Sequence, residues 1–296
     1  MTRTLNPIRF GINPRGLPFD RLVSMVKAAE DAGFDTVTFA DRPPEDNLEG
    51  WTLASAVGAL TRRVILTHST LNVPFRNPAL TAKMAASLDV ITGGRVELTL
   101  GAGGQEPHYR AYGIPFGTPG ERFTNLKDAV TIMRGMWAGE PFSYQGRQYG
   151  VEESMAEPRP VRGAIPIIIG AGKPRMLRYT GAFADGWIKN GGWPDSMEQL
   201  RDLVSQMEAG AVEAGRDPRT IRRVLNCAVH IGSGQPPTDD TARTQGGLIG
   251  TAERILEIVD EYAEAGVDSF HMRFPGPDAE EQIRRFGEEV IAPLRR

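Results

Sequence analysis

Short apolar runs alternate with longer amphipathic segments along most of the chain. In the first such pair, residues 8–12 are rich in apolar side chains. Residues 19–32 follow, with Leu22, Val26 and Ala29 at helical spacing before Gly33. Apolar positions three and four residues apart predict one buried helix face, and a glycine directly after them is typical of a helix end. The pattern therefore predicts a strand followed by a helix.

The same pairing of a strand with a helix recurs eight times along the sequence. We expect strands at residues 8–12, 34–40, 64–68, 95–100, 165–169, 186–189, 224–231 and 267–273. We expect helices at residues 19–32, 51–60, 78–91, 121–137, 174–183, 197–214, 252–265 and 279–294. Two segments lie outside this repeat: residues 142–149, predicted to form a hairpin that turns at Gln145-Gly146, and a loop at residues 233–247.

The alternation predicts parallel strands joined by crossover helices, and eight such units are the number that closes a (β/α)8 TIM barrel. We therefore predict one α/β domain over residues 1–296, with loop insertions and the active site at the rim where the strands end. A doubly wound open sheet is the alternative, and it would carry Gly-x-Gly-x-x-Gly after its first strand. The corresponding loop reads Asn13-Pro-Arg-Gly-Leu-Pro18, which favours the barrel.

Composition and charge narrow the setting in which the protein acts. The 34 Lys and Arg residues against 37 Asp and Glu residues give a net charge of −3, so no basic surface for nucleic acid is expected. The sequence has no run of about 20 apolar residues, and its N-terminus lacks the apolar core of a signal peptide. The single cysteine, Cys227, lies in an apolar run, where we expect it to be buried and inert. We predict a cytoplasmic protein that binds neither membranes nor nucleic acid.

Two glycine-rich turns follow predicted strands and are the first candidates for ligand contact. Leu100-Gly-Ala-Gly-Gly-Gln-Glu106 follows the fourth strand, where glycines let a ligand approach the backbone closely; a flexible loop is the other interpretation. Ile169-Gly-Ala-Gly-Lys-Pro-Arg175 follows the fifth strand and opens a helix. The N–H groups of this second turn could hold an anion such as phosphate, with Lys173 either adding charge or simply solvated.

The remaining polar residues form no recognised catalytic pattern. His68 ends the third strand, where a hydrogen-bonded structural histidine is the expected role, and His108 is expected in a loop. No group of His, Cys, Asp or Glu has metal-ligand spacing, and the sequence contains no Gly-x-Ser-x-Gly. We therefore predict neither a metal site nor a serine hydrolase.

Several segments, taken in order, resemble the bacterial luciferase-like monooxygenase family of flavin and deazaflavin oxidoreductases. They are Asn72-Val-Pro-Phe-Arg-Asn-Pro-Ala79, Gly94-Arg-Val-Glu-Leu-Thr-Leu-Gly-Ala-Gly103, Ala111-Tyr-Gly-Ile-Pro-Phe116 with Glu121-Arg122, Ile168-Ile-Gly-Ala-Gly172, Ala184-Asp-Gly-Trp187, and Gly266-Val-Asp-Ser-Phe-His-Met-Arg273. The resemblance extends over nearly the whole chain. Within the family, the chain looks most like the branch that uses coenzyme F420, a deazaflavin.

The resemblance implies an enzyme, an oxidoreductase that transfers a hydride between F420 and a small organic substrate. It also implies that Glu106 is a proton donor near the deazaflavin ring. The cofactor contacts of the family fall here on Thr70, Leu71, Asn72, Gly103, Gly104, Gly170, Ala171, Gly172, Lys173 and Asn190. The family further implies a homodimer and a non-proline cis peptide at the third strand, placed at Thr70–Leu71 to within one residue.

The chain departs from its apparent relatives at two positions. Many deazaflavin relatives carry an Asp-His pair after the second strand, where this chain has Asp41-Arg42. Relatives that oxidise sugar phosphates carry a lysine where this chain has Trp193, so a sugar-phosphate substrate is not expected. We expect a substrate pocket lined by Asp41, Arg42, Trp51, Trp193 and Arg273.

Two alternative functions remain open at this point. The first is an FMN-dependent monooxygenase supplied by a separate flavin reductase, because FMN and F420 share a tricyclic ring and a phosphate. The second is a flavin-binding barrel without catalytic activity. Glu106 at the functional rim favours an enzyme over the second alternative.

Overall fold

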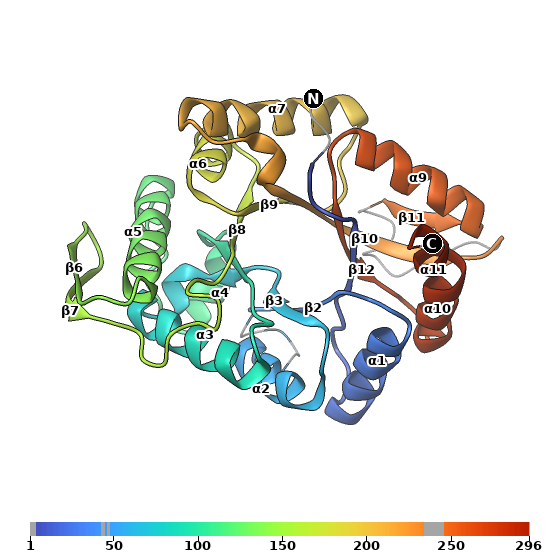
Figure 1. Cartoon of the computed structure of the whole chain (residues 1–296), viewed down its shortest axis with the longest axis horizontal. Coiled ribbons are helices and arrows are strands. Elements are labelled where there is room, and N and C mark those ends of the chain that lie inside the picture. The colour runs from blue at the N-terminus through green and yellow to red at the C-terminus, as the bar shows by residue number, and fades with distance from the viewer. Residues whose placement is uncertain (1–3, 43–44, 46–47, 234–245, 296) are drawn as a thin grey trace. The chain divides into compact units, whose positions relative to one another are not determined.

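The computed structural model describes residues 4–42, 45, 48–233 and 246–295. In this part of the chain a strand is followed by a helix eight times, in the expected order (Figure 1). The pairs are β1 (Arg9–Ile12) and α1 (Phe19–Asp31), β2 (Thr36–Phe39) and α2 (Gly50–Leu60), β3 (Ile65–His68) and α3 (Pro78–Thr92), β5 (Leu98–Gly101) and α5 (Pro119–Trp137), β8 (Ile167–Ala171) and α6 (Pro174–Phe183), β9 (Gly186–Lys189) and α7 (Met197–Glu213), β10 (Arg222–Ile231) and α9 (Ala252–Glu264), and β12 (Ser269–Arg273) and α10 (Ala279–Phe286). Shorter elements are β4 (Leu71–Asn72), η1 (Val73–Phe75), α4 (Glu106–Ala111), β6 (Phe142–Gln145), β7 (Gly150–Ser154), η2 (Pro218–Thr220), β11 (Gly247–Gly250), the π-helical turn η3 (Gly287–Ile291) and α11 (Ala292–Leu294).

These elements belong to two compact units. The first unit contains Met1–Thr38 and Ala171–Arg296, and the second contains Phe39–Gly170.

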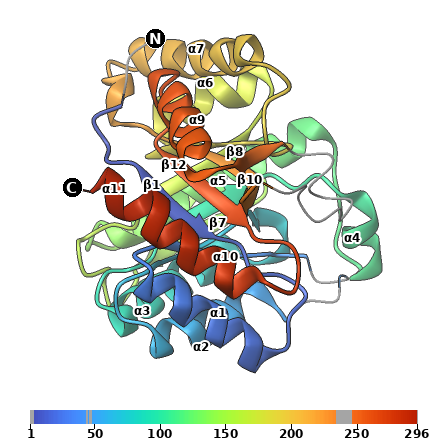
Figure 2. The ribbon, with the colours of Figure 1, turned by 90° about the vertical axis from the view of Figure 1, so that its right-hand side faces the viewer.

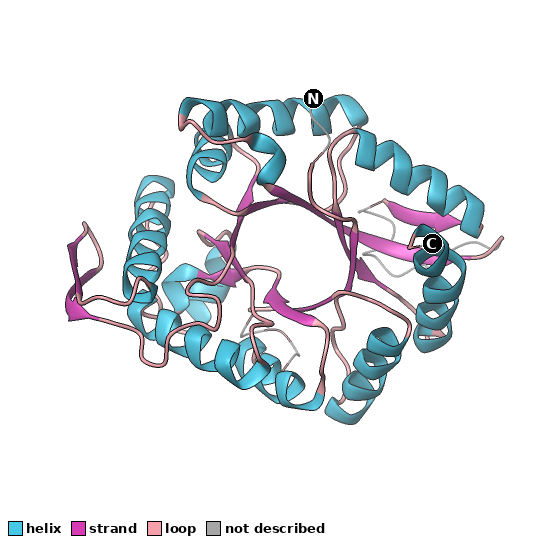
Figure 3. Ribbon diagram, in the orientation of Figure 1, coloured by secondary structure: helices cyan, strands magenta, loops and turns pink. Residues whose placement is uncertain are grey.

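The first unit contains a row of parallel strands in the order β2, β1, β12, β10 and β9, with β11 beside β10. Phe10 and Phe270 occupy paired positions in β1 and β12, and the Phe10 ring meets Phe286 of α10 edge-on with centroids 5.4 Å apart. Helices α1, α6, α7, α9 and α10 lie on the same side of this row of strands (Figure 3). Because successive side chains alternate along a strand, Gly11 and His271 face the opposite side.

The second unit is built around β5, which pairs in parallel with β4 and β8. Leu66 of β3 forms an isolated parallel bridge with Val96, two residues before β5 begins. Its helices have clear ends: the Asn77 side chain accepts a hydrogen bond from the backbone nitrogen of Ala79 where α3 begins, and Gly93 ends α3 with φ +70°. Helix α5 begins with a capping box between Thr118 and Glu121. The short helix α4 lies apart from α2 and α3 (Figure 2).

The structure corrects the predicted hairpin, which is longer than expected. The predicted turn is Gln145-Gly146, but β6 includes Gln145 and the second strand, β7, begins only at Gly150. The reason is Asp128 of α5, whose buried carboxylate accepts hydrogen bonds from the Tyr144 hydroxyl and from the backbone nitrogens of Arg147 and Gln148. These bonds hold residues 146–149 in a wide turn against α5.

Two further elements differ from the prediction. Gly247–Gly250 forms the unpredicted strand β11 beside β10, while residues 234–245 of the predicted loop lie outside the described residues. The last predicted helix, 279–294, is interrupted by the π-helical turn Gly287–Ile291, where a Cβ on Gly287 would come within 2.5 Å of the Ala32 carbonyl oxygen. Ala32, directly after α1, approaches Gly287 so closely that a side chain would not fit there.

Cys227 is buried in β10, as predicted, and its burial raises the pKa of the thiol well above its ordinary range. Among the described residues, no helix is both long and apolar enough to cross a membrane. The same residues include no group of three or more His, Cys, Asp or Glu side chains that could hold a metal ion.

Candidate active site

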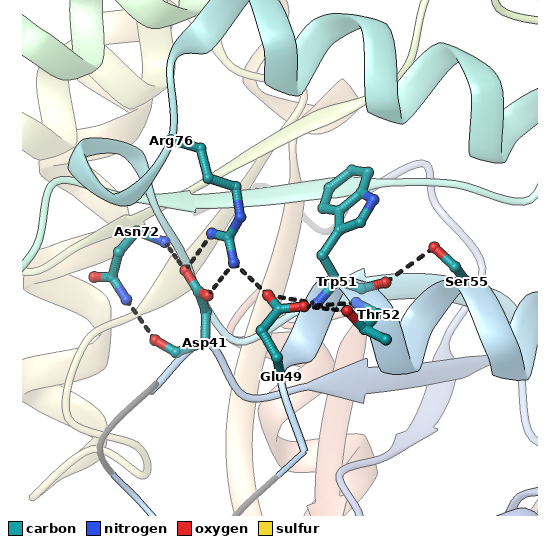
Figure 4. A network of polar contacts seen from close by, with 7 residues as sticks. All are labelled: Asp41, Glu49, Trp51, Thr52, Ser55, Asn72 and Arg76. Atoms are coloured by element: carbon teal, nitrogen blue, oxygen red, sulfur yellow. Dashed lines mark hydrogen bonds and ion pairs between the residues drawn. The ribbon is translucent and has the colours of Figure 1, made fainter. Parts of the chain in front are cut away.

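Asp41 lies in the second unit, two residues after the end of β2, and is the centre of a polar network (Figure 4). Its carboxylate accepts hydrogen bonds from Arg76 Nη1 at 3.0 Å and Nη2 at 2.8 Å, and from the Asn72 backbone nitrogen at 2.7 Å. The Asn72 side-chain amide donates to the Asp41 carbonyl oxygen at 2.8 Å. Asp41 is 1% exposed, so its carboxylate is fully occupied by these partners. Asp41, which the sequence predicts to line a substrate pocket, fixes the position of Asn72.

Glu49 extends this network to the beginning of α2. Arg76 Nη2 also contacts Glu49, and the Glu49 carboxylate accepts hydrogen bonds from the backbone nitrogens of Trp51 and Thr52 and from the Thr52 hydroxyl. Partial burial opposes ionisation of Glu49, but the hydrogen bonds from Thr52 and Trp51 and the charge of Arg76 outweigh it and lower the pKa to about 2. Glu49 is therefore an ionised helix cap that is also tied to Arg76.

His68 lies beneath the first turn of α2. Its imidazole stacks on the Trp51 indole, with ring centroids 5.3 Å apart and the planes 9° from parallel. Neither ring nitrogen has a hydrogen-bond partner among the residues that the structure describes, so the predicted hydrogen-bonded histidine is wrong. Burial lowers the pKa of His68 to about 4, which keeps the ring neutral. Trp51 itself is buried against this ring.

Thr70, Leu71 and Asn72 lie between Asp41 and the end of β5. The Leu71 and Asn72 backbones pair with Leu100 and Gly101 in the β4–β5 ladder, and Leu71 is buried. Thr70 and Asn72 are half-buried and remain partly open to solvent. The structure has a cis peptide bond at Ser69–Thr70, one residue before the bond named from the sequence and within the stated tolerance. A Cβ on Gly101 would be 2.4 Å from Thr70 Oγ1, which explains why a glycine stands there.

The turn after β5 brings Gly103 against Tyr109 of α4. Gly103 has φ +90°, and a Cβ at this position would be 1.8 Å from the Tyr109 hydroxyl oxygen. That hydroxyl is buried and has no hydrogen-bond partner in the described part of the chain, and burial raises its pKa above the usual range. By contrast, a Cβ on Gly104 would meet nothing within 4 Å, so space is open beside the turn.

Glu106, the predicted proton donor, begins α4 instead of ending a loop. Its carboxylate is 3.1 Å from Arg110 Nη2, and its side chain is 56% exposed. His108 also lies on α4, with Nε2 3.8 Å from a Glu45 carboxylate oxygen, and Glu45 accepts a hydrogen bond from Arg42 at 3.0 Å. Arg42, predicted to contact substrate, is thus paired with Glu45 near α4.

Ala171 is the last residue of β8 and Gly172 follows it; both belong to the first unit, while Gly170 is the last residue of the second unit. The Asn190 backbone nitrogen donates to the Ala171 carbonyl oxygen at 3.2 Å, and a Cβ on Gly172 would meet only the Asn190 Cβ, at 3.4 Å. Lys173 and Asn190 are exposed. Lys173 is the N-cap of α6 and gives this helix no side-chain cap, unlike the caps of α2, α3, α5, α7 and α9. The turn at Gly172 and the residue Asn190, both expected from the family resemblance to contact the cofactor, therefore lie side by side at an uncapped helix end.

Trp193 follows Asn190 but packs inward. Its indole lies 4.3 Å from the Tyr262 ring, measured between centroids, and Lys189 Nζ donates to the carbonyl oxygens of Asn190 and Trp193. Burial lowers the pKa of Lys189, and its ammonium group holds this loop in place. Arg273, the last pocket residue predicted from the sequence, ends β12 and is half-buried.

The model of the luciferase-like monooxygenase family matches residues 4–245. A curated relative, F420-dependent glucose-6-phosphate dehydrogenase of Microbacterium testaceum, is 28% identical over 98% of both chains. The enzyme of the same description from Nocardia farcinica is 31% identical over 84% of this chain and 76% of its own. The coenzyme F420-dependent tetrahydromethanopterin reductase of Methanopyrus kandleri has a TM-score of 0.85 and 22% identity over 98% of this chain and 100% of its own.

The chain therefore belongs to the luciferase-like monooxygenase family, and the predicted fold class, a (β/α)8 barrel, is confirmed. Sequence reasoning did not single out Arg76, Glu49 or Tyr109. Arg76 lies inside the quoted segment Asn72–Ala79 and is its only charged residue. An aspartate directly after a buried strand needs a cation or donors when it is buried, so Asp41 could have indicated a partner such as Arg76. Nothing in the sequence singles out Glu49 or Tyr109.

Proposed function

We propose that this protein is a coenzyme F420-dependent oxidoreductase that transfers a hydride between the deazaflavin and a small organic substrate. The observation that carries the proposal is the match over 98% of both chains with an F420-dependent dehydrogenase. The match in fold to an F420-dependent reductase is consistent with it. A sugar phosphate is not the proposed substrate of this protein, because Trp193 packs on Tyr262 and offers no cation for a phosphate at its position.

The segment proposed to hold the deazaflavin ring is Thr70–Asn72 together with Gly103 and Gly104. Two features of the structure support this choice. Thr70 and Asn72 are partly exposed while Leu71 is buried, so the segment presents polar groups from a firm backbone. The space beside Gly104 is open. When bound, F420 supplies or accepts the hydride, and the chain contributes orientation and a proton source.

The turn at Gly172 is proposed to bind the phosphate of the cofactor. Gly170 and Ala171 precede the turn, Lys173 and Asn190 are exposed beside it, and no side chain caps α6. Unsatisfied N–H groups and the helix dipole both stabilise an anion at such a helix end. A Cβ on Gly172 would meet only the Asn190 Cβ, at 3.4 Å, and the absence of this Cβ lets a phosphate approach the backbone of the turn.

Glu106 is proposed to hold or release the proton that accompanies hydride transfer. Its carboxylate is paired with Arg110 and is exposed, so it is accessible to a bound substrate. Arg42, Trp193 and Arg273 are proposed to contact the substrate. Asp41 and Trp51 are buried, so we propose that they support the pocket from behind instead of touching the substrate.

Replacement of Gly172 tests the phosphate site. We expect Gly172→Val to weaken F420 binding at least tenfold, which corresponds to about 1.4 kcal/mol, because the new side chain occupies the place of the phosphate. Fluorescence titration measures the affinity, and thermal unfolding of the unliganded protein checks the fold. A deazaflavin fragment without its phosphate should bind wild type and variant equally. If the variant weakens the fragment as much as F420, the phosphate lies elsewhere.

We also propose that the protein is cytoplasmic, forms a homodimer, and uses residues 1–296 as one functional domain. Support for these points comes from the family resemblance and, for the compartment, from the single buried cysteine. Size-exclusion chromatography with light scattering tests the oligomeric state directly.

A further inference from the structure

Arg76 connects three parts of the second unit that are far apart in sequence. Its guanidinium binds Asp41 after β2 through two parallel hydrogen bonds, and it binds Glu49 at the beginning of α2 (Figure 4). Its own backbone follows η1, four residues after Asn72. The Arg76 side chain is 16% exposed, so most of the contact is shielded from water.

The hydrogen bonds of this network lead from Arg76 through Asp41 to Asn72, which is half-buried. Asp41 holds Asn72 twice, through the backbone nitrogen and through the side-chain amide. On its other side, the Asn72 backbone pairs with Gly101 of β5. Asn72 is therefore fixed from both sides while its side chain stays partly exposed.

A buried ion pair is weak evidence for stability, because apolar side chains of the same volume often stabilise a fold as well or better. What a hydrogen-bonded pair provides is a defined geometry. The planar fork of arginine binds both oxygens of Asp41 and still reaches Glu49, whereas the single ammonium of lysine cannot reproduce two parallel bonds. The choice of arginine thus indicates that the position of Asp41 and Asn72 matters.

We propose that Arg76 is a positioning residue for the cofactor: by joining Asp41 to Glu49 it holds Thr70–Asn72 in the arrangement that accepts the deazaflavin ring. This inference rests on the proposed function. Arg76 acts through Asp41 and Asn72 and does not itself touch the reacting atoms. Loss of its fork loosens the segment without removing any group from the ring contact.

Arg76→Lys tests this role, with Arg95→Lys as the matched control. Arg95 lies in the same unit and donates to the carbonyl oxygens of Gly58, Thr61, Val64 and Thr92, away from the Thr70–Asn72 segment. Both variants lose an arginine fork, so both should unfold at a lower temperature. We expect Arg76→Lys to weaken F420 about tenfold in a fluorescence titration and to alter the absorption spectrum of the bound F420. Arg95→Lys should change the F420 affinity less than twofold.

The outcomes separate this inference from the proposed function. Equal F420 affinity of wild type and Arg76→Lys, or an equal loss in Arg95→Lys, would overturn the positioning role and leave the proposed function standing. Failure of wild type to bind F420 would contradict both. If Arg76→Lys does not fold, Glu49→Gln tests the inference in its place. Glu49 is 43% exposed, and the amide oxygen of the new glutamine can still accept the hydrogen bonds that cap α2. We expect about threefold weaker F420 binding in Glu49→Gln, and an unchanged affinity would overturn the inference.

Discussion

Glu106 stands at the first position of α4, where its carboxylate pairs with Arg110 one turn later. A general acid or base typically contributes about 10²–10⁴-fold to a rate. We therefore expect Glu106→Gln to lower turnover by about that factor with the first substrate found to reduce F420, while F420 affinity stays within twofold. Glu257→Gln, which breaks a similar exposed ion pair with Arg254, is the control and should leave turnover unchanged. Equal turnover of Glu106→Gln and wild type would remove Glu106 from the mechanism.

His68 should make the stability of the protein depend on pH. Its pKa is about 4 in the folded protein against an ordinary value of 6.5, so the unfolded chain takes up a proton first as the pH falls. The stability associated with neutral His68 is therefore complete above about pH 6.5 and is lost progressively toward pH 4. Between pH 7.5 and pH 5, this difference corresponds to about 2 kcal/mol of unfolding free energy.

Replacement of His68 by phenylalanine removes this dependence and keeps a ring beneath Trp51. We expect the unfolding free energy of His68→Phe to fall by about 2 kcal/mol less than that of wild type between pH 7.5 and pH 5. His271, whose pKa burial lowers to about 3, remains in the variant and accounts for the part of the slope that stays. Urea unfolding at the two pH values measures both proteins. An identical loss of stability in the two would show that His68 is not the responsible group.

The turn between β5 and α4 depends on the glycine at position 103. Gly103 has φ +90°, and a Cβ there would overlap the Tyr109 hydroxyl, so the turn and α4 are matched to each other. We expect Gly103→Ala to destabilise the protein by about 1–3 kcal/mol, the usual cost of overpacking, as measured by thermal unfolding. Tyr109→Phe in the same chain should recover only part of the loss, because the Cβ would still lie 2.7 Å from Tyr109 Cζ.

Gly104→Ala is the control for this turn. Its Cβ would meet nothing within 4 Å, so the substitution should leave the unfolding temperature nearly unchanged. If Gly103→Ala were as stable as Gly104→Ala, the close fit of Gly103 to Tyr109 would not constrain the turn.

The sequence predicts helices and strands well wherever one element has its own periodicity. Helix α6 and strand β9 begin and end where the pattern places them, because apolar spacing and flanking Gly or Pro residues are local signals. The length of the hairpin turn and the presence of α4 are not predicted, because neither has such a local signal. The length of the turn after β6 is set by Asp128, which lies in helix α5 and not in the hairpin itself. Helix α4 has six residues and too few apolar positions to show a period.

The same distinction applies to the candidate site. Segments rich in glycine at strand ends were identified because they depend on backbone geometry that a sequence displays. The partners of Asp41 and His68 cannot be predicted in this way, since each is a residue distant along the chain: Arg76 for Asp41 and Trp51 for His68. Contacts between side chains of separate elements leave no periodic pattern and no local motif in the sequence, so they are found only in the folded structure.

The chemistry of the molecule as a whole depends on which tricyclic cofactor the protein binds. The family description names monooxygenases, while two curated relatives, which match 98% and 84% of the chain, are F420-dependent dehydrogenases. Both cofactors carry a phosphate and a flat ring, so neither the Gly172 turn nor the Thr70–Asn72 segment separates them by shape alone. The relative affinities of the protein for F420 and for FMN distinguish the two cofactors.

The most direct measurement is an equilibrium titration of the purified protein with F420 and, in parallel, with FMN, followed by ligand fluorescence at one pH and ionic strength. The account predicts that F420 binds at least tenfold more tightly than FMN, a difference of about 1.4 kcal/mol or more. Tighter binding of FMN than of F420 would contradict the assignment of this enzyme to deazaflavin chemistry.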